Sequence, residues 1–215
     1  MAYSNLKPLR IAIIEDDPLM QLGLKHALDS YGEFMVVAQA EDGYVGLELV
    51  FELQPDVVIM DIGLPGLNGL VATQKIKAAH PEIRVVVLTS HETERETILA
   101  LANGADAHCI KGSQVTQIVD VIAAVQAGAI YLDEKVRHVV TQLQDPQATS
   151  TFTLSDREME VLKLLVAGGS NGSIAEALFL SESTVKAHLR SIMDKFEVND
   201  RVQVAVVALR SGIVK

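Results

Sequence analysis

The first half of the chain alternates short runs rich in β-branched residues with longer amphipathic segments, from Leu9 to about Gly128. This alternation is typical of β-strands and α-helices that take turns around a parallel sheet. Several runs are hydrophobic at nearly every position, as expected when helices cover both faces of the sheet. The predicted strands are Arg10 to Ile14, Phe34 to Ala40, Asp56 to Met60, Ile83 to Leu88 and Asp106 to Ile110.

The segments between these strands have the periodicity of helices. Right-handed crossovers between parallel strands then predict a doubly wound, flavodoxin-like α/β domain with a five-stranded parallel sheet, over residues 7–128. The predicted helices are Pro18 to Ser30, Tyr44 to Leu53, Leu67 to Ala79, Glu92 to Asn103 and Ser113 to Ala127.

The pattern weakens after Gly128, and residues 129–150 are predicted to form a partly helical linker that becomes polar and aperiodic after Leu143. Only helical signals follow. Ser155 with Glu158 three residues later forms a capping box before an apolar run, and Gly168 with the next glycine ends that helix. Residues 151–215 are therefore predicted to form a small all-α domain, with further helices over residues 171–178, 182–196 and 201–211.

Charge is distributed unevenly along the chain. Residues 1–149 carry 10 Lys and Arg against 20 Asp and Glu, whereas residues 150–215 carry 8 of each. Such asymmetry suggests two units with different partners, and a neutral unit can still present a basic face to DNA. Without an apolar leader or a membrane-spanning run, we expect a cytoplasmic chain with no membrane partner. Cys109 is interpreted as a small core residue, with a redox or metal role as the alternative.

Polar side chains gather at the carboxyl ends of the predicted strands. Glu15 and Asp16 end the first strand, Asp61 the third, Thr89 the fourth and Lys111 the fifth. Ligands bind at this edge of open α/β sheets. Three neighbouring carboxylates repel one another unless a hard divalent cation neutralises them, and Mg²⁺ is the natural occupant. The Thr89 hydroxyl and the Lys111 ammonium would suit a phosphoryl group.

Asp61 is the best candidate nucleophile of this group. It follows the apolar run 57–60 and precedes a loop containing Gly63 and Pro65. An Asp oxygen in such a place can accept a phosphoryl group by in-line transfer and form an acyl phosphate.

The residues resemble the receiver domain of two-component response regulators over about residues 9–128. The match rests on Glu15-Asp16, Asp61, Pro65, Thr89-Ser90 and Lys111. The resemblance implies that the acidic residues and the Gly63 carbonyl hold Mg²⁺. It also implies that Asp61 accepts phosphate from a sensor histidine kinase, and that Thr89 and Lys111 bind the phosphoryl group and rearrange. Slow autodephosphorylation is the only catalysis that it implies.

Two positions depart from the family pattern. His108 stands where the family usually has a rotating Tyr or Phe. His108 is interpreted either as an edge-of-core residue or as a switch that bonds to Thr89 after phosphorylation, with a titration near neutral pH. Gly112 replaces the Pro that follows the Lys in many receivers, which excludes a cis-Pro at that loop.

The helical region resembles the NarL/LuxR type of helix-turn-helix over about residues 152–215, through the segments 154–158, 170–178 and 181–189. Helix 182–196 would enter the major groove of double-stranded DNA. The resemblance implies base-edge contacts from Lys186, Ala187 and Arg190, with phosphate or backbone contacts from other positions. The full set of predicted DNA-binding residues is Ser183, Thr184, Lys186, Ala187, His188, Arg190, Lys195 and Arg201.

Gly172 replaces a basic residue common in the family, so one fewer phosphate contact and a shallower salt dependence are expected. We expect a homodimer on DNA with two-fold related half-sites, and RNA polymerase is a further candidate partner. Val202, Val206 and Leu209 are candidates for the dimer contact, although the last two could instead fill the core.

The sequence therefore predicts a transcription regulator in which phosphorylation of Asp61 controls DNA binding. Three alternatives stay open: a phosphatase of the haloacid dehalogenase type, a constitutive DNA-binding regulator that uses the receiver for dimerisation, and a protein-binding module. The first lacks support at Gly63, where those phosphatases carry a second Asp. The sequence does not identify the kinase, the signal, the promoters, the sign of regulation, the dimer interface, or whether the receiver masks the recognition helix.

Overall fold

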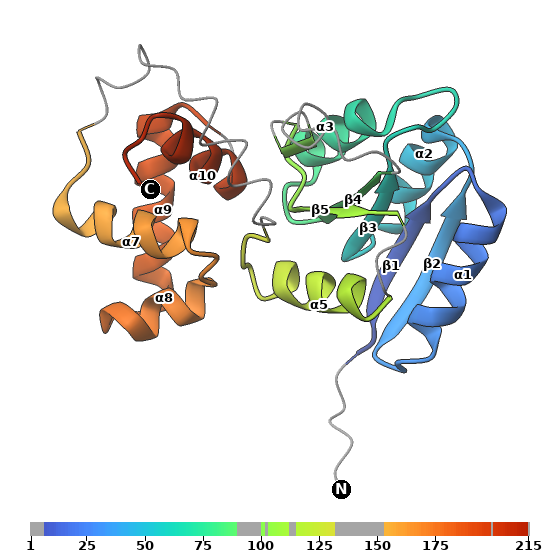
Figure 1. Cartoon of the computed structure of the whole chain (residues 1–215), viewed down its shortest axis with the longest axis horizontal. Coiled ribbons are helices and arrows are strands. Elements are labelled where there is room, and N and C mark those ends of the chain that lie inside the picture. The colour runs from blue at the N-terminus through green and yellow to red at the C-terminus, as the bar shows by residue number, and fades with distance from the viewer. Residues whose placement is uncertain are drawn as a thin grey trace, which may run out of the picture. The chain divides into compact units, whose positions relative to one another are not determined.

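The computed structural model describes residues 7–89, 100–101, 103–111, 115–131, 153–198 and 200–214. The chain divides into two compact units, one built around a β-sheet and the other containing the C-terminal helices (Figure 1). Among the described residues, no helix is both long enough and apolar enough to cross a bilayer. The predicted linker after Tyr131 and most of the predicted helix from Glu92 to Asn103 lie outside these residues.

The sheet has five strands in the order β2-β1-β3-β4-β5. The pairs β1·β2, β1·β3 and β3·β4 are parallel, which confirms the predicted flavodoxin-like topology. The strands are β1 (Leu9–Ile14), β2 (Phe34–Ala40), β3 (Val57–Asp61), β4 (Arg84–Thr89) and β5 (Ala107–Ile110).

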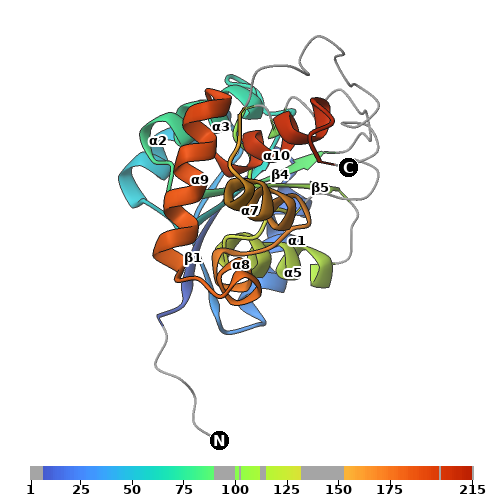
Figure 2. The same ribbon diagram turned by 90° about the vertical axis from the view of Figure 1, so that its left-hand side faces the viewer.

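The strand order reverses between β1 and β3, and this reversal positions the site. Helix α1 (Pro18–Asp29) follows β1 on one face of the sheet, whereas α2 (Gly43–Leu53) and α3 (Gly69–Ala79) cover the other face (Figures 1 and 2). The loops after β1 and β3 therefore diverge and leave a crevice at the carboxyl ends of both strands. Helix α5 (Val115–Gln126) follows β5.

Side-chain caps decide where the helices begin. Asp17 and Asp42 accept hydrogen bonds from the first amides of α1 and α2, and Pro18 occupies the first turn of α1. Helix α3 begins at Gly69, two residues after the predicted start at Leu67, because the Asn68 side chain accepts from the Leu70 amide and ends the preceding loop. The third acid of the run 15–17 is thus a helix cap.

The C-terminal unit contains α7 (Asp156–Val166), α8 (Asn171–Leu178), α9 (Glu182–Phe196) and α10 (Arg201–Arg210). The predicted capping box at Ser155 and Glu158 is present at the start of α7. Helices α7, α8 and α9 pack against one another, and α10 packs against α7 and α9. Shared apolar side chains from all four helices form the core, including Leu162, Ile174, Val185, Ile192 and Val204.

The three candidate dimer residues on α10 belong to this core. Val202, Val206 and Leu209 are all buried. Their burial favours the interpretation that they fill the core.

Candidate phosphoacceptor site and DNA-binding surface

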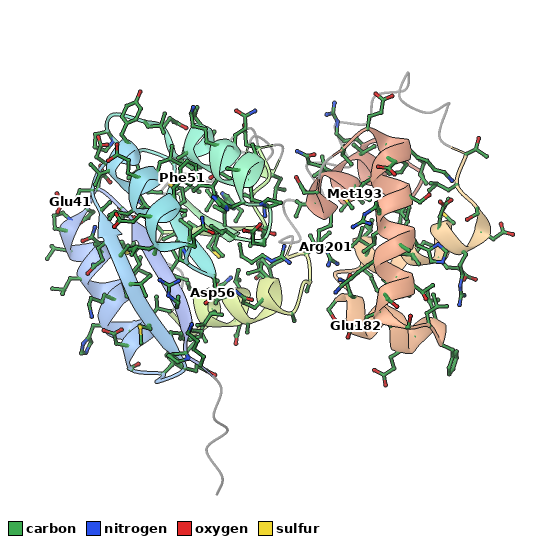
Figure 3. All side chains as sticks on the ribbon, turned by 180° about the vertical axis from the view of Figure 1, so that it is seen from behind. Glu41, Phe51, Asp56, Glu182, Met193 and Arg201 are labelled. Carbon is green, nitrogen blue, oxygen red and sulfur yellow. The ribbon has the colours of Figure 1, made fainter. Side chains whose placement is uncertain are left out.

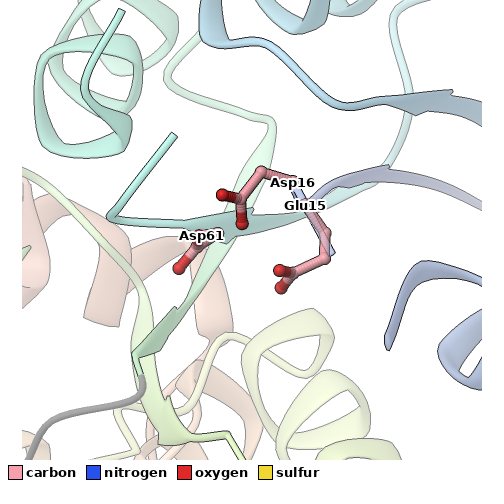
Figure 4. Close-up of side chains that lie close together, drawn as sticks. All are labelled: Glu15, Asp16 and Asp61. Carbon is pink, nitrogen blue, oxygen red and sulfur yellow. The ribbon is translucent and has the colours of Figure 1, made fainter. Parts of the chain in front are cut away.

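Three carboxylates converge at the ends of β1 and β3 (Figure 4). Glu15 directly follows β1, Asp16 is the next residue, and Asp61 is the last residue of β3. One oxygen from each lies within 4.8 Å of the others. Glu15 and Asp61 are buried, whereas Asp16 is exposed. The site is therefore open to ligands on its Asp16 side.

Lys111, just after β5, is the cation of this group. Its Nζ lies 2.7 Å from Oε1 of Glu15, 3.0 Å from Oδ2 of Asp61 and 4.0 Å from Oδ1 of Asp16. The Lys111 amide also donates to the Thr89 carbonyl at 2.6 Å, which ties the end of β5 to the end of β4. One ammonium among three carboxylates leaves two negative charges, which is the charge that one divalent cation would neutralise.

Burial works against the charges in this site. It raises the pKa of Glu15, although hydrogen bonds from Lys111 and the Asp17 amide oppose that shift. Burial alone would lower the pKa of Lys111, but hydrogen bonds to Glu15 and Asp61 outweigh it and raise that pKa. Oε2 of Glu15 is buried and lacks a hydrogen-bond partner among the described residues. A carboxylate oxygen in this state fits a hard cation such as Mg²⁺.

Glycines after β3 allow the chain to lie close to neighbouring groups of the site. A Cβ on Gly69 would lie 1.8 Å from the Asp61 carbonyl oxygen, and one on Gly66, whose φ is +71°, would lie 2.2 Å from the Asp42 carboxylate. A Cβ on Gly63 would make an ordinary contact, 3.6 Å from Oδ2 of Asp61. The Gly63 backbone therefore lies near the Asp61 carboxylate, and the role of its carbonyl as a metal ligand stays a prediction.

The remaining predicted receiver residues lie at the same end of the sheet or near it. Thr89 is the buried last residue of β4. His108 is buried on β5, which favours its interpretation as a core residue, while its switch role stays a prediction. Cys109 is a buried free thiol. Ser90 and Gly112 lie outside the described residues.

Helices α8 and α9 form the predicted helix-turn-helix. Val185, Leu189 and Ile192 bury one face of α9, which Figure 3 shows running from Glu182 past Met193. The opposite face carries the exposed predicted DNA-binding residues Ser183, Lys186, Ala187 and Arg190, with Thr184 and His188 half-buried beside them. At its N-terminus the Ser181 hydroxyl bonds to those of Ser183 and Thr184, at 2.7 and 2.8 Å.

Two predicted DNA-backbone residues have partners inside the helical unit. The Lys195 ammonium donates to Oε2 of Glu158 at 2.6 Å. The Arg201 guanidinium donates to the Gly169 carbonyl at 2.9 Å and to the Asn171 side chain, which joins α10 to the start of α8. Both side chains support the packing of the helices, and any role at DNA would be additional.

Sequence reasoning missed two features of the helix-turn-helix. The Arg157 guanidinium donates to the Leu178 carbonyl at 2.6 Å and so links α7 to the end of α8. Phe179, the turn residue, has a left-handed backbone with φ of 54° and is 97% exposed. Its position between two predicted helices was a sequence signal for the turn, but its exposure could not be inferred from an apolar residue.

Comparison with known proteins agrees with this architecture. Residues 11–123 match the response regulator receiver domain family, and residues 152–208 match the LuxR family of bacterial regulatory proteins. The chain is 35% identical to the transcriptional regulatory protein DegU of Brevibacillus brevis over 229 residues, covering 98% of this chain and 97% of DegU. It is 32% identical to the nitrate/nitrite response regulator protein NarL of Escherichia coli K12, covering 94% and 96%.

Comparison with solved structures supports the same two-domain architecture. The crystal structure of ChrA, a response regulator in a heme-sensing two-component system, is 32% identical, with a TM-score of 0.54 and coverage of 97% of this chain and all of ChrA. The fold and the site thus define a receiver domain joined to a LuxR-type helix-turn-helix domain. The chain belongs to the two-component response regulators of the NarL/LuxR family.

Proposed function

We propose that phosphorylation of Asp61 by a sensor histidine kinase, with Mg²⁺ bound, controls sequence-specific DNA binding by α9 and thereby transcription. The observation that carries this proposal is the Lys111 ammonium between the Glu15 and Asp61 carboxylates at the reversal of strand order. An Asp61 oxygen, the Lys111 cation and an excess of negative charge lie at one edge of the sheet, which supports transfer of a phosphoryl group to Asp61.

The site residues suit transfer of a phosphoryl group. Glu15, Asp16 and Asp61, with the Gly63 carbonyl, would hold Mg²⁺, which when bound offsets charge on the phosphoryl oxygens. An Asp61 oxygen forms the new bond to phosphorus while the nitrogen–phosphorus bond of the donor histidine breaks. Lys111 then exchanges part of its pairing with Asp61 for a phosphoryl oxygen. The backbone amide of Lys111 is bonded to the Thr89 carbonyl, so the two phosphoryl-binding candidates lie on directly connected strand ends.

The exposed face of α9 supports the DNA-binding half of the proposal. Lys186, Ala187 and Arg190 stand on the face opposite the core, where a helix in the major groove would present them to base edges. Ser183 and Thr184 would contact phosphates at the N-terminus of α9, where the helix dipole favours anions, and His188 is a further groove-facing candidate. Arg201 would add a backbone contact. The relatives DegU and NarL, named as a transcriptional regulator and a response regulator, support the same output.

We further propose that the chain acts as a homodimer on DNA with two-fold related half-sites. One recognition helix reads only a few base pairs, so doubling the contact multiplies both affinity and specificity. The dimer contact is not assigned to Val202, Val206 or Leu209, since these residues fill the core. RNA polymerase would be the partner at the output step.

The decisive experiment maps bound DNA across the genome for the wild-type chain and for Asp61→Asn. The proposal predicts sequence-specific sites whose occupancy falls in Asp61→Asn and in a strain without the kinase. Unchanged occupancy in Asp61→Asn would instead identify a constitutive DNA-binding regulator. Loss of Lys186 and Arg190 together without any loss of occupancy would identify a protein-binding module. Turnover of a phosphomonoester that Asp61→Ala abolishes would identify a phosphatase.

A further inference from the structure

A buried carboxylate on α7 holds two successive turns of α9. Oε1 of Glu158 accepts from the Ser191 hydroxyl at 2.7 Å, and Oε2 accepts from the Lys195 ammonium at 2.6 Å. Oε2 also accepts from the Ser155 amide at 2.7 Å. Glu158 is only 5% exposed. A single side chain therefore joins the start of α7 to the C-terminal half of α9.

The spacing of Ser191 and Lys195 along α9 determines how Glu158 constrains the helix. Ser191 and Lys195 are four residues apart, so they lie on the same side of α9 in adjacent turns. The apolar core beneath α9 favours burial but has little directional preference. Hydrogen bonds are directional, and here they hold α9 at two successive turns. Together they fix the rotation of α9 about its own axis and its position along that axis. A displacement of one residue would rotate α9 by about 100° and shift it by about 1.5 Å.

Charge alone would argue against an acidic residue at this place. Glu158 lies behind the helix whose outer face carries Lys186 and Arg190, and a carboxylate near DNA repels phosphates. Its partner Lys195 loses part of its own attraction for phosphates because the ammonium is bonded to Glu158. We infer that accurate positioning of α9 compensates for this electrostatic cost, since groups that read base edges must be held within fractions of an ångström.

We propose that Glu158 is a positioning residue for DNA recognition, and that Lys195 acts as its partner and does not contact a DNA phosphate. This inference rests on the proposed DNA-binding function. It replaces the sequence-based assignment of Lys195 to the DNA backbone. The resulting arrangement separates two groups on α9: Lys186 and Arg190 read the DNA, while Ser191 and Lys195 hold the helix at the angle from which they read it.

The test uses the full-length chain after treatment with acetyl phosphate and Mg²⁺. The probe is a fluorescent duplex that the wild-type chain selects from a random-sequence library, with an unselected duplex for non-specific binding. Glu158→Gln removes the charge and keeps the shape. The matched control is Glu160→Gln, on the same helix, whose exposed carboxylate pairs only with Arg157 among the described residues. Failure of the wild-type chain to select any duplex would overturn the proposed function itself.

The sign of the effect separates the two explanations. By charge alone, Glu158→Gln would strengthen binding to both duplexes. The proposal predicts that it weakens binding to the selected duplex by about 10-fold, the size expected when hydrogen bonds to a charged group are lost. Binding to the unselected duplex should change by less than about 2-fold. Glu160→Gln should leave both affinities unchanged. Equal or tighter binding of Glu158→Gln to the selected duplex would overturn the positioning role.

A folding defect gives a different pattern, because it lowers binding to both duplexes in proportion to the folded fraction. Ser191→Ala serves as the milder variant, since it removes one hydroxyl from the partly exposed side of the contact. It should lower selected-duplex affinity about 3-fold, in line with one hydrogen bond, with an unchanged melting temperature. An unchanged affinity for Ser191→Ala would count against the positioning role even if Glu158→Gln failed to fold.

Salt dependence tests the assignment of Lys195. A residue that neutralises one phosphate contributes about 0.9 to the slope of log affinity against log salt. Lys195→Met should leave that slope unchanged while lowering specific affinity to the same extent as Glu158→Gln. The double variant should be no worse than either single variant, because the pair acts as one unit. A slope reduced by about 0.9 in Lys195→Met would show that Lys195 contacts a phosphate, and would overturn its assignment as a partner of Glu158 alone.

Discussion

The ammonium of Lys111 lies 3.0 Å from Oδ2 of Asp61, and the same ammonium lies 2.7 Å from Oε1 of Glu15. Both carboxylates are buried, so a single cation shields two acids that would otherwise repel each other at close range. The Asp61 side chain, the proposed phosphoacceptor, is therefore paired with a residue 50 positions away in the sequence, at the end of a different strand.

Asp61→Asn should stabilise the receiver in the absence of metal. It removes one of three repelling carboxylates and leaves Lys111 paired with Glu15, so we expect the free energy of unfolding to rise by about 1 kcal/mol. Stabilisation by added Mg²⁺ should shrink in the same variant, because a ligand is lost. Thermal unfolding in chelator and in Mg²⁺ measures both effects. A variant less stable than the wild type in chelator would contradict this account.

Gly69→Ala should disrupt the site, whereas Gly63→Ala should be tolerated by the fold. A Cβ at Gly69 would meet the Asp61 carbonyl at 1.8 Å, and backbone must move to admit it, at a cost of about 2–3 kcal/mol. A Cβ at Gly63 meets Oδ2 of Asp61 at an ordinary distance of 3.6 Å. Gly69→Ala should lower the free energy of unfolding, measured by chemical denaturation, and should reduce the extent of phosphorylation by acetyl phosphate. Equal stability of the two variants would refute the steric argument.

Acid should weaken the helical unit through Glu158. Burial by itself would raise the pKa of this carboxyl, but hydrogen bonds from Lys195, Ser191 and Ser155 lower it to about 2. Since the folded pKa lies below the ordinary value of 4.5, the stabilisation is complete above pH 4.5 and is lost as the pH falls towards 2. Wild-type stability should therefore decline more steeply over this window than that of Glu158→Gln. Hydrogen exchange of α9 amides provides the measurement, with Glu160→Gln as the control.

Phe179→Gly should stabilise the helix-turn-helix. The residue has a left-handed backbone, which is unfavourable for any residue with a side chain, and it is 97% exposed, so it contributes little packing. Glycine at a helix C-cap in this conformation should raise the free energy of unfolding by about 0.5–1 kcal/mol. Phe179→Ala keeps the strained backbone and should change stability little. If the alanine variant were as stable as the glycine variant, backbone strain would not be the cause.

Gly172→Lys should strengthen DNA binding and steepen its salt dependence. A Cβ at this helical position would lie 3.3 Å from Oε1 of Glu182, at the end of a long side chain that can shift to admit it. One added phosphate contact should raise the salt slope by about 0.9. Gly172→Ala controls for the gain in helix propensity, which should raise stability by about 0.5–1 kcal/mol without altering the slope. Identical slopes for the lysine and alanine variants would show that position 172 does not face a phosphate.

Much of the architecture was predictable because it depends on local patterns. Short runs rich in apolar and β-branched residues identified all five strands, and helices α8 and α9 begin and end at the predicted residues. The boundary errors were of one or two residues: β3 lies one residue later than predicted, and the Asn68 cap delays α3 by two residues. The acidic residues and Lys111 were predicted to converge because parallel strands place their carboxyl ends at one edge.

Other features of the site depend on contacts between distant residues. Nothing adjacent to Lys195 in the sequence indicates that it pairs with Glu158, 37 residues earlier, or that Arg201 bonds to Gly169. A basic residue on a helix next to a recognition face carries the same local pattern whether it contacts DNA or a buried acid. Only the packing of α7 and α10 against their neighbours distinguishes the two cases.

The sequence by itself determined the order of strands and helices and the location of the helix-turn-helix, and it predicts Asp61 as the phosphoacceptor, because hydrophobic periodicity and strand-end chemistry are local properties. The tertiary structure decided which charged side chains form ion pairs within the protein. Lys111 is shared by Glu15 and Asp61, and Lys195 is bonded to Glu158. The physical reason is that an ion pair forms only where folding brings two charged side chains close together. For residues far apart in the sequence, the separation of the side chains is set by the packing of the helices and strands.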